Sequence, residues 1–156
     1  MGIRKILTDK DDALHKVCKP VTVFDAKLHK LLDDMAETLE KARGVGLAAP
    51  QVGILRRVVI VDTGDEILEL INPELLETSG EQEGAEGCLS VPGKYGWVKR
   101  PYYATVRAQD RHGNWFVVEG EELIARCFCH ELDHLDGILY TSVMDRFLTK
   151  EELEED

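Results

Sequence analysis

The sequence lacks a long hydrophobic run. The longest aliphatic stretch of the 156-residue chain, at positions 58–61, is far shorter than the roughly 20 residues of a membrane-spanning helix. The first residues, MGIRKILTDKDD, become acidic before the apolar core of a signal peptide can form. We therefore expect a cytoplasmic protein with no membrane partner.

Basic residues are also scarce. The chain has 19 Lys and Arg against 30 Asp and Glu, which gives a formal net charge of −11 and a pI of about 4.9. No basic stripe interrupts this composition, and an acidic surface repels phosphate groups. Direct binding of DNA or RNA is therefore not expected.

No internal repeat, linker or low-complexity segment divides the chain. With 156 residues, of which 44% are hydrophobic and 31% charged, it has the size and composition of one soluble domain with a substantial core. We expect residues 1–150 to form that domain. Residues 151–156 are mostly acidic and are expected to be a frayed tail.

Hydrophobic spacing predicts two main helices and several strands. One helix is expected over residues 25–43, with Asp25 as its N-cap, and another over residues 121–136. Strands are expected at residues 3–7, 58–62, 67–71, 102–108 and 115–119. The polar residues 72–87 are expected to form a strand edge and a loop. The predicted fold class is α+β, a single compact domain of mainly antiparallel strands packed around the helix in the C-terminal half.

This second helix carries the pattern H-E-x-x-H in His130, Glu131 and His134. Residues four positions apart lie on one face of a helix, so both imidazoles can bind one metal ion, with Glu131 placed to contact a water beside it. The pattern also occurs by chance in helices that hold no metal. Here Leu123 and Cys127 extend the histidine face as an apolar stripe, which indicates that the imidazoles point inward and need partners.

A catalytic metal of this kind takes three protein ligands and leaves one position for water, so a third ligand is needed. Among four cysteines, which we expect as thiols in a reducing cytosol, Cys88 lies in the segment EGCLS. Gly87 lets the backbone there approach a metal closely, and thiolate is a strong ligand. The backbone N–H of the next residue, Leu89, can point into the same site. Cys18 and the free carboxylates remain alternatives.

The glycine-rich stretch GVGLAAPQVG at residues 44–53 has two interpretations. It can be a tight loop over small packed residues, which is the favoured interpretation for the stretch in isolation. Alternatively, Gly44 and Gly46 let a peptide backbone lie close, and Gln51 supplies an uncharged N–H donor for a carbonyl oxygen that gains charge.

Three segments together resemble, in order, the signature motifs of the peptide deformylases: GVGLAAPQ at 44–51, EGCLS at 86–90 and HELDHLDG at 130–137. The length of the chain, the intervals between the motifs and the opening ILTDKDDALHKVCKPV at 6–21 are also similar to that family. The resemblance therefore covers nearly the whole chain, and it is specific because three motifs co-occur.

The resemblance implies a metal-dependent hydrolase that removes the N-formyl group from the initiating methionine of new polypeptides, in the bacterial cytosol or in an organelle. Cys88, His130 and His134 would then hold one divalent ion per chain. This ion is Fe²⁺ in the native enzymes of the family, and Zn²⁺, Ni²⁺ or Co²⁺ are possible substitutes.

The resemblance also assigns roles at the reacting group. Glu131 would be the general base, and the Gln51 amide and the Leu89 N–H would stabilise the oxygen that gains charge. The substrate backbone would pair with Val45 and Gly46 in the manner of an added strand. Candidate walls of the methionine pocket are Val45, Leu89, Leu123, Cys127 and the His130 ring.

The implied partners are N-formylmethionyl peptides and nascent chains. Some family members contact the ribosome through a longer, basic C-terminal helix, a route that this acidic ending makes doubtful. Two rival hypotheses are an H-E-x-x-H peptidase, which would not need Cys88 or the glycine-rich loop, and a non-catalytic relative that binds formylated peptides or a structural metal. The second would be expected to lose Glu131 or Gln51, and both are present.

Three residues differ from those common in the family, namely Arg43, Arg126 and Cys129, and they leave the peptide preference open. Asp133 is expected to face away from the metal. Two alternatives are open for its side chain: plain solvation, or a salt bridge that holds the helix, for which Arg100 is the first candidate.

Overall fold

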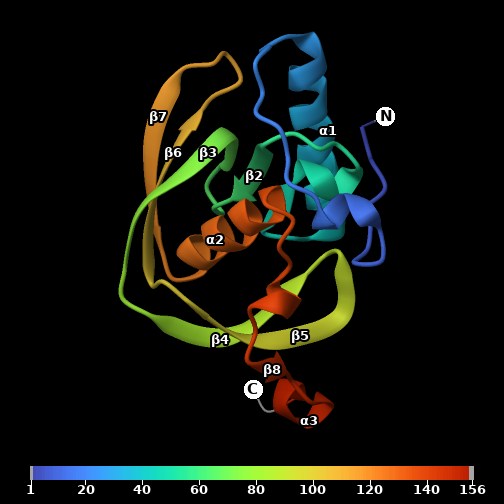
Figure 1. Cartoon of the computed structure of the whole chain (residues 1–156), viewed down its shortest axis with the longest axis vertical. Coiled ribbons are helices and arrows are strands. Elements are labelled where there is room, and N and C mark those ends of the chain that lie inside the picture. The colour runs from blue at the N-terminus through green and yellow to red at the C-terminus, as the bar shows by residue number, and fades with distance from the viewer. Residues whose placement is uncertain (1, 155–156) are drawn as a thin grey trace.

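Two antiparallel sheets surround a central helix in the computed structural model, which describes residues 2–154 (Figure 1). The elements, in chain order, are η1 (Asp12–His15), α1 (Ala26–Ala42), β1 (Gly46–Ala48), η2 (Ala49–Val52), β2 (Val58–Asp62), β3 (Ile67–Ser79), β4 (Gln82–Cys88), β5 (Val91–Arg100), β6 (Tyr103–Gln109), β7 (Trp115–Glu121), α2 (Leu123–Leu135), η3 (Tyr140–Ser142), β8 (Arg146–Phe147) and α3 (Lys150–Glu154). The α+β prediction is confirmed.

The larger sheet has the strand order β1-β2-β3-β6-β7, and the smaller one has the order β4-β5-β8. Strand β1 is an edge strand that pairs only with β2 within residues 2–154, with Gly46 opposite Val61. Strand β4 pairs with β5 and ends at Cys88. One edge of the larger sheet and the end of a strand in the smaller sheet therefore both border the space beside α2.

Helix α2 packs its apolar face on the larger sheet. Ala125, Phe128 and Leu135 are fully buried in one apolar cluster with residues of β2, β3 and β6. The helix ends at Leu135, and Gly137 follows with a φ of 76°, which is the left-handed region that glycine adopts at low cost. A Cβ at Gly137 would lie 2.7 Å from the backbone of His15, so close packing also requires glycine here.

Helix α1 covers the other side of the larger sheet and follows the pattern that predicted it. Asp25 accepts a hydrogen bond from the Leu28 N–H at 3.2 Å, and Arg43 ends the helix at a φ of 57°. The apolar face of α1 forms a second buried cluster with Leu47 and Ile60. The helix predicted over residues 25–43 is thus confirmed to within one residue at each end.

Two sequence predictions are wrong. Residues 3–7 form no strand. The Leu7 N–H donates to the Gln51 carbonyl at 2.7 Å, but no ladder of backbone hydrogen bonds follows from this contact. Residues 72–87 are mostly strand, since β3 continues to Ser79 and β4 begins at Gln82. This segment looks like a loop because residues 74–79 of β3 are all exposed and show no alternation of buried apolar and exposed polar side chains.

The C-terminal residues 150–154 form the short helix α3, and residues 155–156 lie outside the described part of the chain. The frayed acidic tail therefore stays a prediction. Within residues 2–154, no helix combines the length and apolar character that crossing a membrane requires.

Candidate active site

Helix α2 and strand β4 bring three potential metal ligands together. His130 and His134 lie one turn apart on α2 with ring centroids 4.9 Å apart, and Cys88 is the last residue of β4. One ligand atom from each lies within 4.8 Å of the others, and no second such group occurs in residues 2–154. The alternative thiol, Cys18, is buried in the apolar core and does not belong to this group.

The donor set suits a tetrahedral divalent ion. Sγ of Cys88 lies 3.3 Å from Nε2 of His134. Metal–sulfur and metal–nitrogen bonds of about 2.3 and 2.1 Å at a tetrahedral angle place such atoms about 3.6 Å apart. A thiolate and two neutral imidazoles are good ligands for first-row divalent metals and leave one position for water.

Glu86 precedes Cys88 by two residues on β4 and fixes the orientation of His130. Its Oε2 lies 2.6 Å from His130 Nδ1. Burial alone would raise the pKa of the Glu86 carboxyl, but hydrogen bonds from His130 and Arg100 outweigh burial and lower that pKa to about 2. An ionised carboxylate can only accept, so Nδ1 carries the proton and donates, which leaves Nε2 available for a metal.

Two arginines neutralise the buried Glu86 carboxylate. Arg100 of β5 donates to both carboxylate oxygens, at 3.1 and 2.7 Å, and Arg126 of α2 donates to Oε1 at 2.9 Å. Arg126 also donates to the Val98 carbonyl at 3.3 Å, which ties α2 to the smaller sheet. The predicted salt bridge between Arg100 and Asp133 is confirmed at 2.8 Å.

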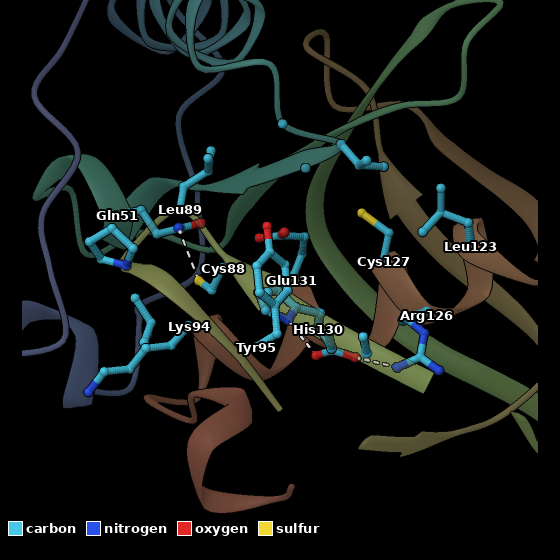
Figure 2. Close-up of a pocket in the computed structure, with 18 of the residues that line it drawn as sticks. Gln51, Cys88, Leu89, Lys94, Tyr95, Leu123, Arg126, Cys127, His130 and Glu131 are labelled. Carbon is cyan, nitrogen blue, oxygen red and sulfur yellow. Dashed lines mark hydrogen bonds and ion pairs between the residues drawn. The ribbon is translucent and has the colours of Figure 1, made fainter. Parts of the chain in front are cut away.

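Glu131 follows His130 on α2 and lies in the middle of the pocket (Figure 2). Its side chain is buried, and its Oε1 has no hydrogen-bond partner within residues 2–154. Burial raises the pKa of the Glu131 carboxyl to about 7, in the range where a general base is most effective near neutral pH. This carboxylate is therefore suited to accept a proton from a water beside the three ligands.

Gln51 lies on η2 and is held by two hydrogen bonds. Its Oε1 accepts from the Ala48 N–H at 2.9 Å, and its Nε2 donates to Ser90 Oγ at 3.0 Å. The same nitrogen lies 3.7 Å from Cys88 Sγ. These contacts fix an uncharged N–H donor beside the group of potential ligands.

A pocket of about 420 Å³ opens beside these residues and reaches the edge strand β1. The residues predicted to bind substrate all line it, namely Val45, Gly46, Leu89, Leu123, Cys127 and His130. Gln51 and Leu89 lie on one side of Glu131, whereas Cys127 and Leu123 lie on the other (Figure 2). Burial raises the pKa of the Cys127 thiol, so this wall of the pocket is neutral.

The sequence analysis assigned no role to Glu86 or Ser90. A signal for Glu86 exists, because residues two apart on a strand share one face and Glu86 stands two positions before Cys88. Ser90 has no comparable signal, since its contact joins the turn after β4 to Gln51 on η2, 39 residues earlier in the chain.

Comparison with known proteins places the chain in a family. The family model for polypeptide deformylase matches residues 3–150. The chain belongs to this family. A peptide deformylase of Acetivibrio thermocellus is 55% identical over 154 residues, which cover 99% of this chain and 91% of that protein. Peptide deformylase 1 of Bacillus subtilis is 50% identical over 155 residues, which cover 98% and 97%.

Solved peptide deformylases share the fold. The crystal structure of a peptide deformylase from Legionella pneumophila has a TM-score of 0.89 at 44% identity and covers 96% of this chain and 88% of that one. A peptide deformylase from Synechococcus elongatus, solved in complex with actinonin, has a TM-score of 0.88 at 36% identity, with coverage of 99% and 84%. The family resemblance inferred from the three motifs is confirmed.

The orientation of His130 by Glu86 leads to a prediction about metal affinity. Glu86→Gln is expected to weaken metal binding by about 10–100-fold, because a neutral amide is a weaker acceptor for Nδ1–H and leaves two arginines uncompensated. Competition with a chromophoric chelator measures the metal Kd. The matched variant Glu83→Gln, at an exposed position of the same strand, should keep the wild-type Kd. Equal Kd values for all three proteins would contradict the role of Glu86.

Proposed function

We propose that Cys88, His130 and His134 hold one divalent metal ion and that Glu131 transfers the proton in the reaction of this peptide deformylase. The reaction is hydrolysis of the N-formyl group from the N-terminal formylmethionine of newly made polypeptides, which releases formate. The observation that carries the assignment is that three potential ligand atoms lie together beside the pocket lined by Glu131, whose Oε1 has no hydrogen-bond partner within residues 2–154.

The metal is proposed to be Fe²⁺, with Zn²⁺, Ni²⁺ or Co²⁺ as possible substitutes, because nitrogen and sulfur ligands suit all four ions. When bound, the ion supplies a Lewis acid that lowers the pKa of a coordinated water and polarises a carbonyl oxygen. The protein contributes the fixed donor set, with the His130 ring oriented by Glu86 at 2.6 Å.

Glu131 is proposed to move one proton through the reaction. It takes the proton from the attacking water as the water oxygen bonds to the formyl carbon. It then gives this proton to the leaving nitrogen as the carbon–nitrogen bond breaks, so that formate and a free amino terminus result. General acid–base catalysis of this kind contributes about 10²–10⁴-fold in rate.

Gln51 and Leu89 are proposed to stabilise the formyl oxygen as it gains negative charge. The Gln51 amide is held by Ala48 and Ser90, so it needs no rearrangement to donate. The Leu89 backbone N–H follows directly after Cys88 and would be the second donor. Loss of one such donor typically costs about 3–4 kcal/mol of barrier lowering.

The substrate peptide is proposed to lie along the edge of β1. Its backbone would pair with Val45 and Gly46, since the edge of β1 that faces away from β2 has no strand partner within residues 2–154. The methionine side chain would enter the apolar part of the pocket formed by Leu123, Cys127 and the His130 ring. The placement of Gln51 and Leu89 on one side of Glu131, and of Cys127 and Leu123 on the other, supports this arrangement (Figure 2).

Gly46 offers a direct test of this geometry. A Cβ at Gly46 would lie 2.6 Å from Cys127 Sγ and 2.8 Å from Glu131 Oε2, so a methyl group must displace the catalytic carboxylate. A misplacement of about 1 Å can lower a rate by about 10²-fold, and we expect Gly46→Ala to reduce kcat by about this factor at unchanged metal content. Formate release and metal analysis on the same samples check this. A wild-type kcat would contradict the proposed position of Glu131.

Product analysis separates this function from its two rivals. Metal-loaded protein is incubated with formyl-Met-Ala-Ser and, in parallel, with acetyl-Met-Ala-Ser. The proposal predicts formate and intact Met-Ala-Ser from the first peptide. Little reaction is expected with the second, because its larger acyl group crowds the reacting carbon. Cleavage of an internal peptide bond would instead indicate a peptidase. Saturable binding without any product would indicate a non-catalytic relative.

A further inference from the structure

A second groove lies beside helix α1, apart from the active-site pocket. Its volume is about 850 Å³, and it is lined mainly by residues 19–23, the first turns of α1 and residues 53–56, together with Arg4 and Val58. It shares no lining residue with the active-site pocket. A ligand in this groove would therefore contact neither the proposed metal ligands nor Glu131. The deformylase reaction thus gives the groove no role.

The groove is basic, in a chain with a net charge of −11. Five basic side chains line it against one acidic side chain, Asp25, which caps α1. Arg4 and Lys30 both pair with Asp34, at 2.8 and 3.4 Å. The other three basic residues are exposed and have no ion-pair partner within residues 2–154: Lys19, Lys27 and Arg56. This local reversal of charge favours a ligand with negative charge.

The remaining lining of the groove is mostly aliphatic. Val21, Leu28 and Ile54 contribute to it, and Val23 is 63% exposed. No aromatic side chain lines the groove, so it offers no platform on which nucleic-acid bases could stack. Basic side chains around an aliphatic surface are complementary to a ligand that carries both carboxylates and aliphatic groups.

The backbone of residues 19–23 favours a peptide as that ligand. Lys19 forms an isolated parallel bridge with Arg56, and Val21 binds the side chain of Asn72 through its N–H and its carbonyl, at 2.8 and 2.9 Å. The next residues, Thr22 and Val23, take part in none of the loop backbone hydrogen bonds within residues 2–154. Their main-chain N–H and C=O groups can therefore form hydrogen bonds with the backbone of an added peptide chain. A lipid has no backbone that could form such a ladder.

We propose that this groove docks an extended segment of a partner protein in which acidic and aliphatic side chains alternate. Carboxylates of that segment pair with Lys19, Lys27 and Arg56, and its aliphatic side chains cover the floor of the groove. The acidic helix α3 of the same molecule does not supply this segment, because α3 and the first turn of α1 lie at opposite ends of the long axis (Figure 1).

A designed probe tests the proposal with the whole chain. Fluorescein-labelled Glu-Val-Glu-Leu-Asp-Val-Glu is titrated with the protein at low salt, and binding is followed by fluorescence anisotropy. We expect saturable binding that weakens as the salt concentration rises. The double variant Lys19→Glu/Arg56→Glu should raise the Kd at least about tenfold. The matched variant Lys10→Glu/Lys41→Glu has the same net charge but alters exposed positions outside the groove, and its Kd should stay within about twofold of wild type.

Formate release by both variants serves as the control for folding, and it should equal that of the wild type because neither variant alters the active-site pocket. An equal loss of binding in the two variants would overturn the proposal, since it would indicate attraction by net charge alone. Equal binding of a probe with Lys in place of its acidic residues would also overturn it. So would displacement of the probe by an RNA oligonucleotide or by anionic vesicles at lower concentration than by unlabelled peptide. Concentration-dependent self-association that only the groove variant abolishes would assign the groove to a second copy and overturn it too.

Discussion

Replacement of Glu131 by Gln is expected to lower kcat for formate release by about 10²–10⁴-fold without loss of metal. Gln has the same size as Glu, so the pocket keeps its shape, but an amide cannot accept the proton of the attacking water at neutral pH. Glu131 Oε1 has no hydrogen-bond partner within residues 2–154. Burial raises the pKa of the Glu131 carboxyl to about 7, which suits a general base near neutral pH. Metal analysis and steady-state kinetics on one preparation give both quantities.

An exposed glutamate on α1 provides the matched control for this prediction. Glu40→Gln makes the same chemical change at a position outside the pocket, and its kcat should equal that of the wild type. If Glu131→Gln retained wild-type kcat, the proton would be carried by another group. A loss of metal in Glu131→Gln would instead place this residue among the ligands, which contradicts the proposed assignment.

Replacement of Cys88 by Ala is expected to abolish stable metal binding and, with it, activity. The thiolate is one of three proposed ligands, and His130 and His134 alone give a two-ligand site. Loss of a hydrogen-bond partner of a ligand, such as Glu86, typically weakens metal affinity by about 10–100-fold. Loss of the ligand Cys88 should therefore weaken metal affinity by more than this. Metal per chain after dialysis against a weak chelator, measured by atomic emission, checks this.

Cys129→Ser is the matched control because Cys129 is a buried thiol on α2 that lies outside the ligand group. It should retain one ion per chain. Retention of a full ion by Cys88→Ala would refute the ligand set, and loss of the ion from Cys129→Ser would show that metal content does not distinguish the thiols. Unfolding curves followed by circular dichroism confirm that both variants are folded before metal is measured.

Local sequence patterns were sufficient for the elements whose structure is set by their own residues. The helix over residues 25–43 has both a capping Asp25 and regular apolar spacing, and both are found in α1. The strand at residues 58–62 is apolar at its first four residues, all of which are fully buried, and ends at the exposed Asp62. The approach of Cys88 to His130 and His134 could be inferred only from co-occurring motifs, because no local pattern relates β4 to α2.

Residues whose structure depends on partners far along the chain could not be predicted from local sequence patterns. Glu86 is a buried charge on β4, and its partners Arg100, Arg126 and His130 lie 14, 40 and 44 residues further along the chain. A pattern of polar residues and glycines looks like a loop when those partners are unknown. In the same way, residues 3–7 look like a strand, but within residues 2–154 the only backbone–backbone hydrogen bond of this segment joins the Leu7 N–H to the Gln51 carbonyl, so no ladder forms.

The central claim is that one divalent ion held by Cys88, His130 and His134 supports removal of the formyl group. Its most direct test is an anaerobic titration of metal-free protein with Fe²⁺, with formate release from formyl-Met-Ala-Ser measured at each step. The account predicts a rate that rises in proportion to bound iron and stops rising at one ion per chain. Absence of formate release at one bound ion per chain, or a rate that does not depend on bound iron, would contradict it.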